Sequence, residues 1–372
     1  MKSIRTSTRF WRLGATAGLV IAVVLGCQLL RAAAVAQALG PDTDILYVGD
    51  GSDDTVKIFR ASDGTSLNGA SGAFIKSSGG LHGPMGLLIA GPELIVDNQD
   101  VNLPISGEIS RYQLNNGSFA GTWISKSDPN APFAPRGAVI HNGVLYVANM
   151  VTQANTPGGV LVFAGDGRFL GSPVPCAGSM TPHPRGIVVG PDGLLYVASD
   201  PVLGGIGGQV FVFDPVSLKC NGIFINDAGG PGALNRPEGL VFGLDGNLYV
   251  TSFCAAPSTC PTPSDIDSIR IYGGPPSPLN AGGNTGKLLG VINLDPLAQP
   301  IGQKRATAQA LVFGPGGTLF LPITFRPAVA GQVVTCNVVT KACNGFTGLG
   351  TLGAPFYLTF GRTDSGTLAY FE

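Results

Sequence analysis

The stretch that decides the fold reads Pro184-Arg185-Gly186-Ile187-Val188-Val189-Gly190-Pro191-Asp192-Gly193-Leu194-Leu195-Tyr196-Val197. An apolar segment, a tight Asp-Gly turn and a second apolar segment follow one another, which is the pattern of a β-hairpin with glycine at positive φ. Related stretches return at 135–147 and 236–250. A repeat of about fifty residues built from short strands is typical of a β-propeller. The repeat predicts an architecture and leaves the chemistry open.

A Leu-Tyr-Val motif marks the second strand of each repeat. Five full units begin near Pro84, Pro135, Pro184, Pro237 and Gln309, and part-units stand at both ends of the sequence. We therefore predict an all-β, six-bladed β-propeller of four-stranded antiparallel blades, with seven blades as the alternative. N- and C-terminal strands would close the ring, which removes exposed sheet edges. The motif occurs at 46–48, 94–96, 145–147, 195–197, 248–250 and 319–321, with a degenerate copy at 368–370.

The degenerate copy leaves one question about the closing blade. Both ends supply a second-strand motif, so that blade has one strand too many. Either the segment 368–371 is displaced from the blade, or the blade has five strands.

The N-terminal segment predicts export. A basic start precedes an apolar run at 13–30 and the small residues Ala36 and Ala38, which suit cleavage after residue 38. We expect a signal peptide at 1–38 and one propeller domain at 39–372, with an insertion at about 253–305. The mature protein would be periplasmic or secreted. The alternatives are a lipoprotein anchored at Cys27, which follows a lipobox-like Val-Leu-Gly, and an uncleaved membrane anchor.

Cysteine usage agrees with export. The sequence has seven cysteines, and removal of Cys27 with the leader leaves an even number, which suggests disulfides. Proximity in the sequence favours three pairs among fifteen possible pairings. A zinc site is the weaker alternative, because no Cys-x-x-Cys spacing is present. The favoured pairs are Cys254 with Cys260, Cys336 with Cys343, and Cys176 with Cys220.

Composition excludes one class of partner. Charged residues make up 12% of the chain and the formal net charge is −1. A nucleic-acid partner would require clustered Lys and Arg to neutralise phosphates. We expect a monomer that has no nucleic-acid partner and meets a membrane only through an N-terminal anchor.

The Pro-x-Gly-Leu/Ile and Asp-Gly-x-Leu-Tyr-Val elements resemble those of NHL-repeat propellers over roughly 44–372. That group also includes the regucalcin/gluconolactonase, strictosidine-synthase-like and virginiamycin-B-lyase propellers. The resemblance implies that the residue before the glycine of Pro-x-Gly lies at the entrance of the central channel. The corresponding positions are Met85, Arg136, Arg185, Glu238, Gln309 and Tyr357.

The channel face is the default position for a ligand site, and its arginines favour an anion. Arginine forks match carboxylate geometry, so a carboxylated or sulfated small molecule, or a protein partner, would bind there without catalysis or cofactor. The structural alternative is that the arginines pair with Glu238 and with blade carbonyls. The predicted ligand-binding residues are Arg136, Arg185, Arg236, His82, Gln309 and Asn149.

The resemblance also implies an enzymatic alternative, a metal-assisted lactonase, hydrolase or lyase. Regucalcin-like lactonases hold one divalent metal such as calcium with a Glu, an Asn and an Asp. Here Glu238 is the one carboxylate at a channel entrance, Asn98 and Asn149 could supply amide oxygens, and no equivalent Asp is evident. In an enzyme, Glu238 and His183 would be the catalytic residues, because imidazole titrates near neutrality.

Overall fold

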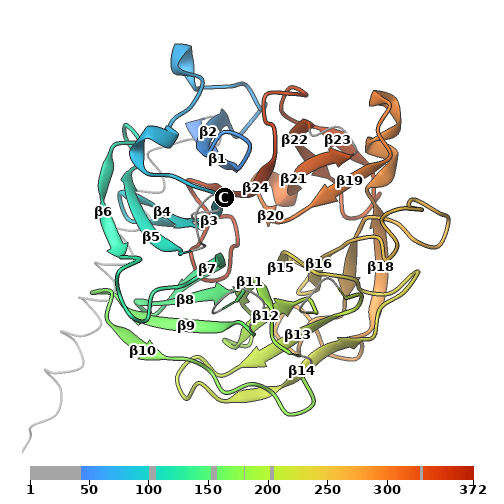
Figure 1. Cartoon of the computed structure of the whole chain (residues 1–372). Coiled ribbons are helices and arrows are strands. Elements are labelled where there is room, and N and C mark those ends of the chain that lie inside the picture. Colours follow the sequence, from blue (N-terminus) through green and yellow to red (C-terminus); the bar gives the residue numbers. More distant parts are fainter. Residues whose placement is uncertain (1–42, 100–105, 152–156, 180, 202–204, 327–329) are drawn as a thin grey trace, which may run out of the picture.

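Six sheets surround one central axis in the computed structural model (Figure 1). The structure describes residues 43–372 except 100–105, 152–156, 180, 202–204 and 327–329. The predicted leader and Cys27 therefore lie outside the described residues. Within the described part, no helix has the length and apolar character needed to span a bilayer.

The architecture is the predicted six-bladed propeller, so the seven-bladed alternative is wrong. We number the blades from the closing blade, in which the sheet order is β24-β1-β2. Blade 1 contains β1 (Ile45–Asp50), β2 (Thr55–Arg60) and β24 (Pro355–Phe360). Blade 2 contains β3 (Pro84–Ala90), β4 (Glu93–Asn98), β5 (Glu108–Gln113) and β6 (Phe119–Ile124). Blade 3 contains β7 (Pro135–His141), β8 (Val144–Asn149), β9 (Gly159–Ala164) and β10 (Phe169–Gly171).

The remaining blades follow the same antiparallel order outward from the axis. Blade 4 contains β11 (Pro184–Val189), β12 (Leu195–Ser199), β13 (Gly208–Phe213) and β14 (Cys220–Asp227). Blade 5 contains β15 (Leu240–Phe242), β16 (Leu248–Ser252), β17 (Ser268–Tyr272) and β18 (Leu288–Asn293). Blade 6 contains β19 (Arg305–Ala308), β20 (Val312–Phe313), β21 (Leu319–Arg326), β22 (Ala330–Cys336) and β23 (Cys343–Gly345). Short 3₁₀ turns lie at Gly69–Ser71, Ser77–Gly79, Asp295–Leu297, Gln299–Ile301 and Pro315–Gly317.

The repeated Leu-Tyr-Val motif builds the core between blades. Its Leu and Val are fully buried, as in Leu195 and Val197, and Tyr196 and Tyr249 each pack edge-on against a phenylalanine of the next blade. The Tyr196 ring lies 4.9 Å from the Phe242 ring, centroid to centroid. The Tyr196 hydroxyl donates to the Asp-Gly turn at Asp192 Oδ2, 2.9 Å away. One motif therefore stabilises a turn and an inter-blade contact together.

Ring closure occurs as predicted, with the C-terminal strand innermost in the blade begun by the N-terminus. In the β1–β24 ladder, Leu46 is opposite Phe360 and Val48 is opposite Leu358. The segment after β24 leaves this blade and runs towards the middle of the ring (Figure 1). There the Ser365 carbonyl accepts from Ile140 N, at 2.8 Å. The displaced-segment answer is therefore the correct one, and the tail packs where the inner strands end.

In blades 1 to 5 a recurring hydrogen bond ties the second strand to the start of the inner strand. The last side chain of β8, Asn149, accepts through Oδ1 from Ala134 N at 2.8 Å, just before Pro135. Amide, hydroxyl and carboxylate groups serve equally, since each offers an oxygen acceptor. The equivalent bonds are Asn98 Oδ1 from His82 N, Ser199 Oγ from His183 N, Ser252 Oγ from Asn235 N, and Asp50 Oδ1 from Ala354 N.

All three predicted disulfide pairs are confirmed. Cys176 bonds to Cys220, Cys254 to Cys260, and Cys336 to Cys343.

Candidate functional site

The residues expected at the channel entrance surround one small cavity. Its volume is about 10 Å³, which is near the minimum that holds one water molecule. Side chains therefore fill the axis, and an organic ligand has no room there in this conformation. The cavity is lined by Met85, Arg136, Gly137, Arg185, Glu238, Gln309, Phe356 and Tyr357.

An ion network occupies the channel. Arg185 Nη1 lies 3.3 Å from Glu238 Oε1. The same guanidinium donates to both oxygens of Asp200, at 3.1 and 2.9 Å, and His183 Nδ1 contacts Asp200 as well. Burial raises the pKa of Glu238, although Arg185 and Arg136 oppose this effect. Glu238 and His183 thus belong to one network, in which Arg185 and Asp200 connect them. No signal in the sequence had linked Asp200 to these two residues.

Arg136 lies in the same channel without a carboxylate within 4 Å among the described residues. Its Nη1 is 3.3 Å from the sulfur of Met85 and 3.5 Å from Gln309 Oε1. Burial lowers the pKa of Arg136 to about 10, and the charge of Arg185 adds to this effect. The charge of Glu238 is the main compensation, so the channel ions depend on one another.

Two of the expected ligand-binding residues lie elsewhere. The Asn149 amide is used by the hydrogen bond to Ala134 N described above. The His82 side chain is 41% exposed, and its Nδ1 lies 3.6 Å from Asp54 Oδ2, away from the channel cavity. Neither side chain contributes to the lining of the central cavity.

The channel does not fit the divalent metal of the lactonase alternative. Asn98 and Asn149 direct their amide oxygens at backbone N–H groups, and Glu238 faces a guanidinium. A hard cation requires several free oxygen ligands around one point. We derive no metal-assisted step here. The expectation of cofactor-free function stays a prediction.

A larger pocket opens beside the axis, between blades 5 and 6. Its volume is about 480 Å³, and it lies on the face where the inner strands begin, opposite the C-terminal tail. Gln309 lines both this pocket and the channel cavity. The lining residues are Arg236, Phe253, Pro257, Ser258, Cys260, Lys304, Arg305, Thr307, Gln309 and Arg326. We call this the basic pocket.

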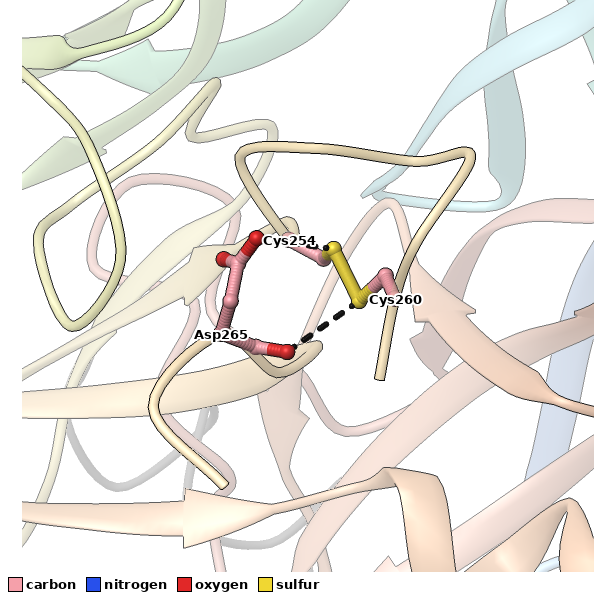
Figure 2. Close-up of side chains that lie close together, drawn as sticks. All are labelled: Cys254, Cys260 and Asp265. Carbon is pink, nitrogen blue, oxygen red and sulfur yellow. Dashed lines mark hydrogen bonds between the residues drawn. A yellow bond between two sulfur atoms is a disulfide. The ribbon is translucent and has the colours of Figure 1, made fainter. Parts of the chain in front are cut away.

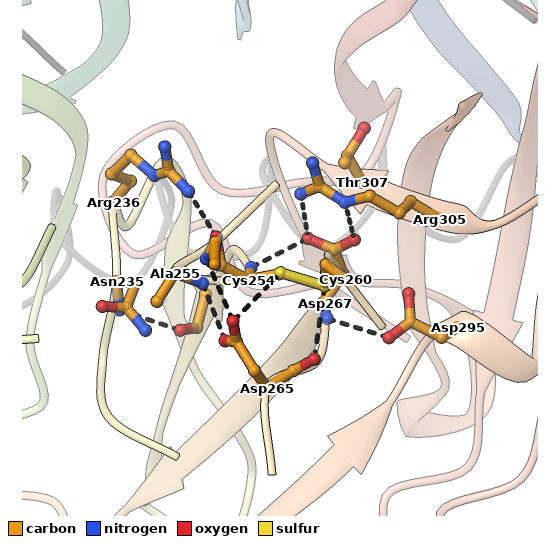
Figure 3. Close-up of polar contacts among 12 residues, drawn as sticks. Asn235, Arg236, Cys254, Ala255, Cys260, Asp265, Asp267, Asp295, Arg305 and Thr307 are labelled. Carbon is orange, nitrogen blue, oxygen red and sulfur yellow. Dashed lines mark hydrogen bonds and ion pairs between the residues drawn. A yellow bond between two sulfur atoms is a disulfide. The ribbon is translucent and has the colours of Figure 1, made fainter. Parts of the chain in front are cut away.

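The basic pocket separates Arg236 from the other two expected arginines. Arg236 precedes Pro237, so its side chain starts two residues before the channel-entrance residue Glu238. Its Nη2 donates to the Cys254 carbonyl oxygen (Figure 3). Its φ of 44° is in the left-handed region, which is uncommon for a residue with a Cβ. Two arginines therefore make the contacts of the structural alternative. Arg236 bonds to a backbone carbonyl oxygen, and Arg185 pairs with Glu238.

Buried carboxylates form the floor beneath these cations (Figure 3). Arg305 makes two bonds to Asp267, from Nε and Nη2, each 2.7 Å long. Asp265 accepts from the backbone of Ala255 and Ala256, at 2.7 and 3.0 Å. These bonds hold the loop that carries Pro257 and Ser258, so the floor positions one wall of the pocket.

The Cys254–Cys260 disulfide closes that same loop (Figure 2). Both sulfur atoms lie near Asp265: Cys254 Sγ is 3.3 Å from Oδ2, and Cys260 Sγ is 3.2 Å from the carbonyl oxygen. The grouping resembles a metal-ligand set, but disulfide sulfurs carry no thiolate charge. The cluster is therefore a structural support of the pocket wall.

Sequence reasoning did not identify Lys304, Arg305 and Arg326. Arg305 begins β19 and is the register partner of Arg326, which ends β21, and Lys304 N donates to the Arg326 carbonyl. Blade 6 lacks a Pro-x-Gly element, so the motif does not mark the residues that lead into its inner strand. The available signal was the pair Lys304-Arg305 directly before an apolar strand.

Asp97 carries a buried carboxyl group on β4, opposite Gly86 of the inner strand. Burial raises its pKa to about 8, and within the described part Oδ2 has no hydrogen-bond partner. The folded chain therefore keeps a proton that the unfolded chain releases above the ordinary pKa of 3.8. The free energy of unfolding is therefore unaffected by Asp97 below that pH. Above it, the free energy of unfolding falls as the pH rises towards 8.

We expect this loss to approach about 1.4 kcal/mol per pH unit within that window. Asp97→Asn should flatten the dependence and raise the free energy of unfolding at pH 8. Urea unfolding at pH 5, 6, 7 and 8 measures both effects, with the exposed Asp166→Asn as the matched control. An Asp97→Asn profile parallel to the wild type would show that this carboxyl group ionises normally.

Comparison with known proteins identifies the fold. No protein-family model matches the sequence, and no curated protein matches it either. Among solved structures, a nidogen/laminin complex is 16% identical with a TM-score of 0.54, covering 86% of this chain and 98% of that chain. The periplasmic gluconolactonase of Pseudomonas aeruginosa is 17% identical with a TM-score of 0.51, covering 85% and 98%. A protein of unknown function from Bacteroides caccae is 13% identical with a TM-score of 0.52, covering 86% and 98%. At such identities the likeness shows the propeller fold and nothing about activity.

Proposed function

We propose that this protein is an exported propeller that binds a small organic anion in the basic pocket and has no catalysis of its own. One observation carries the proposal: four cationic side chains line this cavity of about 480 Å³. Of the four, Arg305 alone has a carboxylate within 4 Å in the described part of the chain. An anionic ligand would supply the missing opposite charge.

The shape of the pocket supports a small molecule. Its volume falls within the range usual for small-molecule sites, and Phe253 and Pro257 add apolar surface to the polar lining. A protein partner covering the same face is the alternative. The concave form favours the small molecule.

The backbone at Arg236 gives further support. A non-glycine residue at φ 44° costs roughly 1 kcal/mol or more, and such strain is often found at functional sites. Here the strained residue places its guanidinium against the wall of the basic pocket.

Export rests on the leader pattern and on the disulfides. Three disulfides are typical of proteins that fold in an oxidising compartment. A structural neighbour whose title calls it periplasmic is consistent with the same location.

One observation supports the enzymatic alternative. Contact with Asp200 orients the His183 ring, as a general base requires, and Arg185 connects Asp200 to Glu238. The cavity beside these groups is about 10 Å³, however, which favours a structural role for them. The Glu238 experiment in the Discussion distinguishes the two roles.

Arg236→Asn tests the binding proposal. Asn tolerates left-handed φ, so the substitution removes the cation without adding backbone strain. We expect organic anions to bind the wild type in calorimetric titration, and the variant to bind them about ten- to hundredfold more weakly, the usual effect of losing a charge-assisted hydrogen bond.

Arg168→Gln is the control, because it removes one exposed charge on blade 3, far along the chain from the pocket lining. It should bind like the wild type. Equal affinity of the Arg236→Asn variant and the wild type would place any anion site elsewhere. Absence of binding to carboxylates, phosphates and sulfates alike would contradict the proposed function.

A further inference from the structure

We infer that the ligand of the basic pocket is a small organic dianion, with one anionic group between Arg236 and Arg305 and the second at the outer pair Lys304 and Arg326. The inference rests on the proposed function, because it specifies the class of ligand for the same site. It excludes monocarboxylates and single inorganic ions as the preferred ligands.

The charge balance of the pocket favours two negative charges. Four cations line the pocket, and two buried carboxylates lie beneath it, so two positive charges are left. Those carboxylates are Asp267, which is bonded to Arg305, and Asp265, which is bonded to backbone N–H groups. Asp295 adds only part of a charge at neutral pH, because burial and Asp267 raise its pKa to about 7.

The inner pair of cations comes from two different blades. Arg236 precedes β15 of blade 5, and Arg305 begins β19 of blade 6; Figure 3 shows their guanidinium groups on opposite sides of the Cys254–Cys260 disulfide. Both side chains are partly buried. The pKa of Arg236 is lowered by burial and by the charge of Arg305, which is consistent with two cations that lie near each other. An oxyanion between them would relieve this repulsion and would accept hydrogen bonds from both.

The outer pair lies at the solvent side of the pocket. Lys304 and Arg326 are both exposed, and within the described ranges neither side chain makes an ion pair or a hydrogen bond. They are joined through the backbone by the Lys304 N to Arg326 O bond of 2.8 Å. Their charges therefore lie together at the rim and remain available to a second anionic group.

The surface between the two pairs suits a carbon skeleton with polar substituents. Phe253 and Pro257 offer apolar contacts, and Ser258, Thr307 and Gln309 offer hydrogen-bonding groups. A volume of about 480 Å³ exceeds the need of inorganic phosphate or sulfate. The chemical class is thus a dicarboxylate, or a phosphorylated carboxylic acid, each of which carries two anionic groups.

Matched pairs of ligands test the inference on the full mature protein. Calorimetric titration at constant ionic strength compares succinate with butyrate, adipate with hexanoate, and 3-phosphoglycerate with glycerate, so that each pair differs by one anionic group. We expect the best dianion to bind at least about tenfold more tightly than its partner, since each additional charge-assisted contact contributes roughly this factor. Comparison of 3-phosphoglycerate with the dicarboxylates shows whether the site prefers a phosphate as one of the two anionic groups.

The double variant Lys304→Gln/Arg326→Gln removes the outer pair alone. We expect it to lose the preference for dianions, to within about twofold, while its affinity for the monocarboxylates stays within about twofold of the wild type. Circular dichroism and the midpoint of thermal unfolding confirm that the variant folds. A double variant that keeps the full dianion preference contradicts the inference.

The outcomes separate the two proposals. Equal binding of dianions and their monoanionic partners overturns the dianion inference and leaves the proposed function in place. Failure of every anion to bind overturns both. Binding of inorganic phosphate or sulfate as tightly as the best organic dianion also overturns the inference, because the apolar and hydroxyl surface would then contribute nothing.

Discussion

Replacement of Glu238 by alanine is expected to lower the free energy of unfolding by about 3–5 kcal/mol, the range for breaking a buried ion pair. Glu238 Oε1 lies 3.3 Å from Arg185 Nη1, and both side chains are about 10% exposed. Its charge is also the main compensation for Arg136, which has no carboxylate within 4 Å among the described residues. The variant would leave buried guanidinium groups with too little negative charge. Urea unfolding at pH 7 measures the loss.

Glu93→Ala is the matched control for this experiment. Glu93 also pairs with an arginine, with Oε2 3.7 Å from Arg111 Nη1, but that pair is considerably more exposed. Exposed pairs contribute about 0–1 kcal/mol, so the control should lose little stability. A Glu238→Ala variant as stable as the control would contradict the structural role. If it also lost hydrolysis of a lactone, the enzymatic alternative would become the better one.

The second large effect is expected at Asp50, the carboxylate that joins the two ends of the chain. Asp50 is fully buried; it pairs with Lys57 at 2.7 Å and accepts from Gly353 N and Ala354 N, each at 2.9 Å. Asp50→Ala removes the buried one of the two carboxylates that pair with Lys57 and leaves two N–H groups just before β24 without their acceptor. We expect a loss of about 3–5 kcal/mol in urea unfolding.

Asp53→Ala is a close control, because Asp53 pairs with the same lysine at 2.8 Å from a side chain that is 47% exposed. It should cost about 1 kcal/mol or less. Equal losses in the two variants would show that attraction to Lys57, and not ring closure, determines the effect of Asp50.

Acid gives an independent measure of the same group. Burial disfavours the charge of Asp50, but its bonds from Lys57 and from the backbone outweigh burial and hold its pKa below the ordinary value of 3.8. A depressed folded-state pKa contributes stability above the unfolded value, and this stability is lost as the pH falls through the folded-state pKa. The wild type should therefore lose stability below about pH 4 more steeply than Asp50→Asn does.

Much of the fold could be predicted from the sequence because the repeat is local. The Asp-Gly turn, the buried Leu and Val and the inter-blade Tyr all stand within fourteen residues of one another, as in 184–197. Counting such units predicted six blades and the closing role of β24. The disulfide pairs followed from proximity in the sequence. The site was harder, since Asn149 resembled a ligand residue and proved to accept a backbone hydrogen bond.

What the sequence determined by itself was the number of blades and the face on which charged residues gather, because strand period and turn chemistry act over a few neighbouring residues. Tertiary structure alone decided which of these charges meet. The side chains of Arg185 and Glu238 pair within the channel, whereas Arg236 bonds to the Cys254 carbonyl and lines the same pocket as Arg305, 69 residues further along the chain. That arrangement depends on how two blades pack and on the path of the disulfide-closed loop between them. Such long-range packing has no local sequence period from which it could be read.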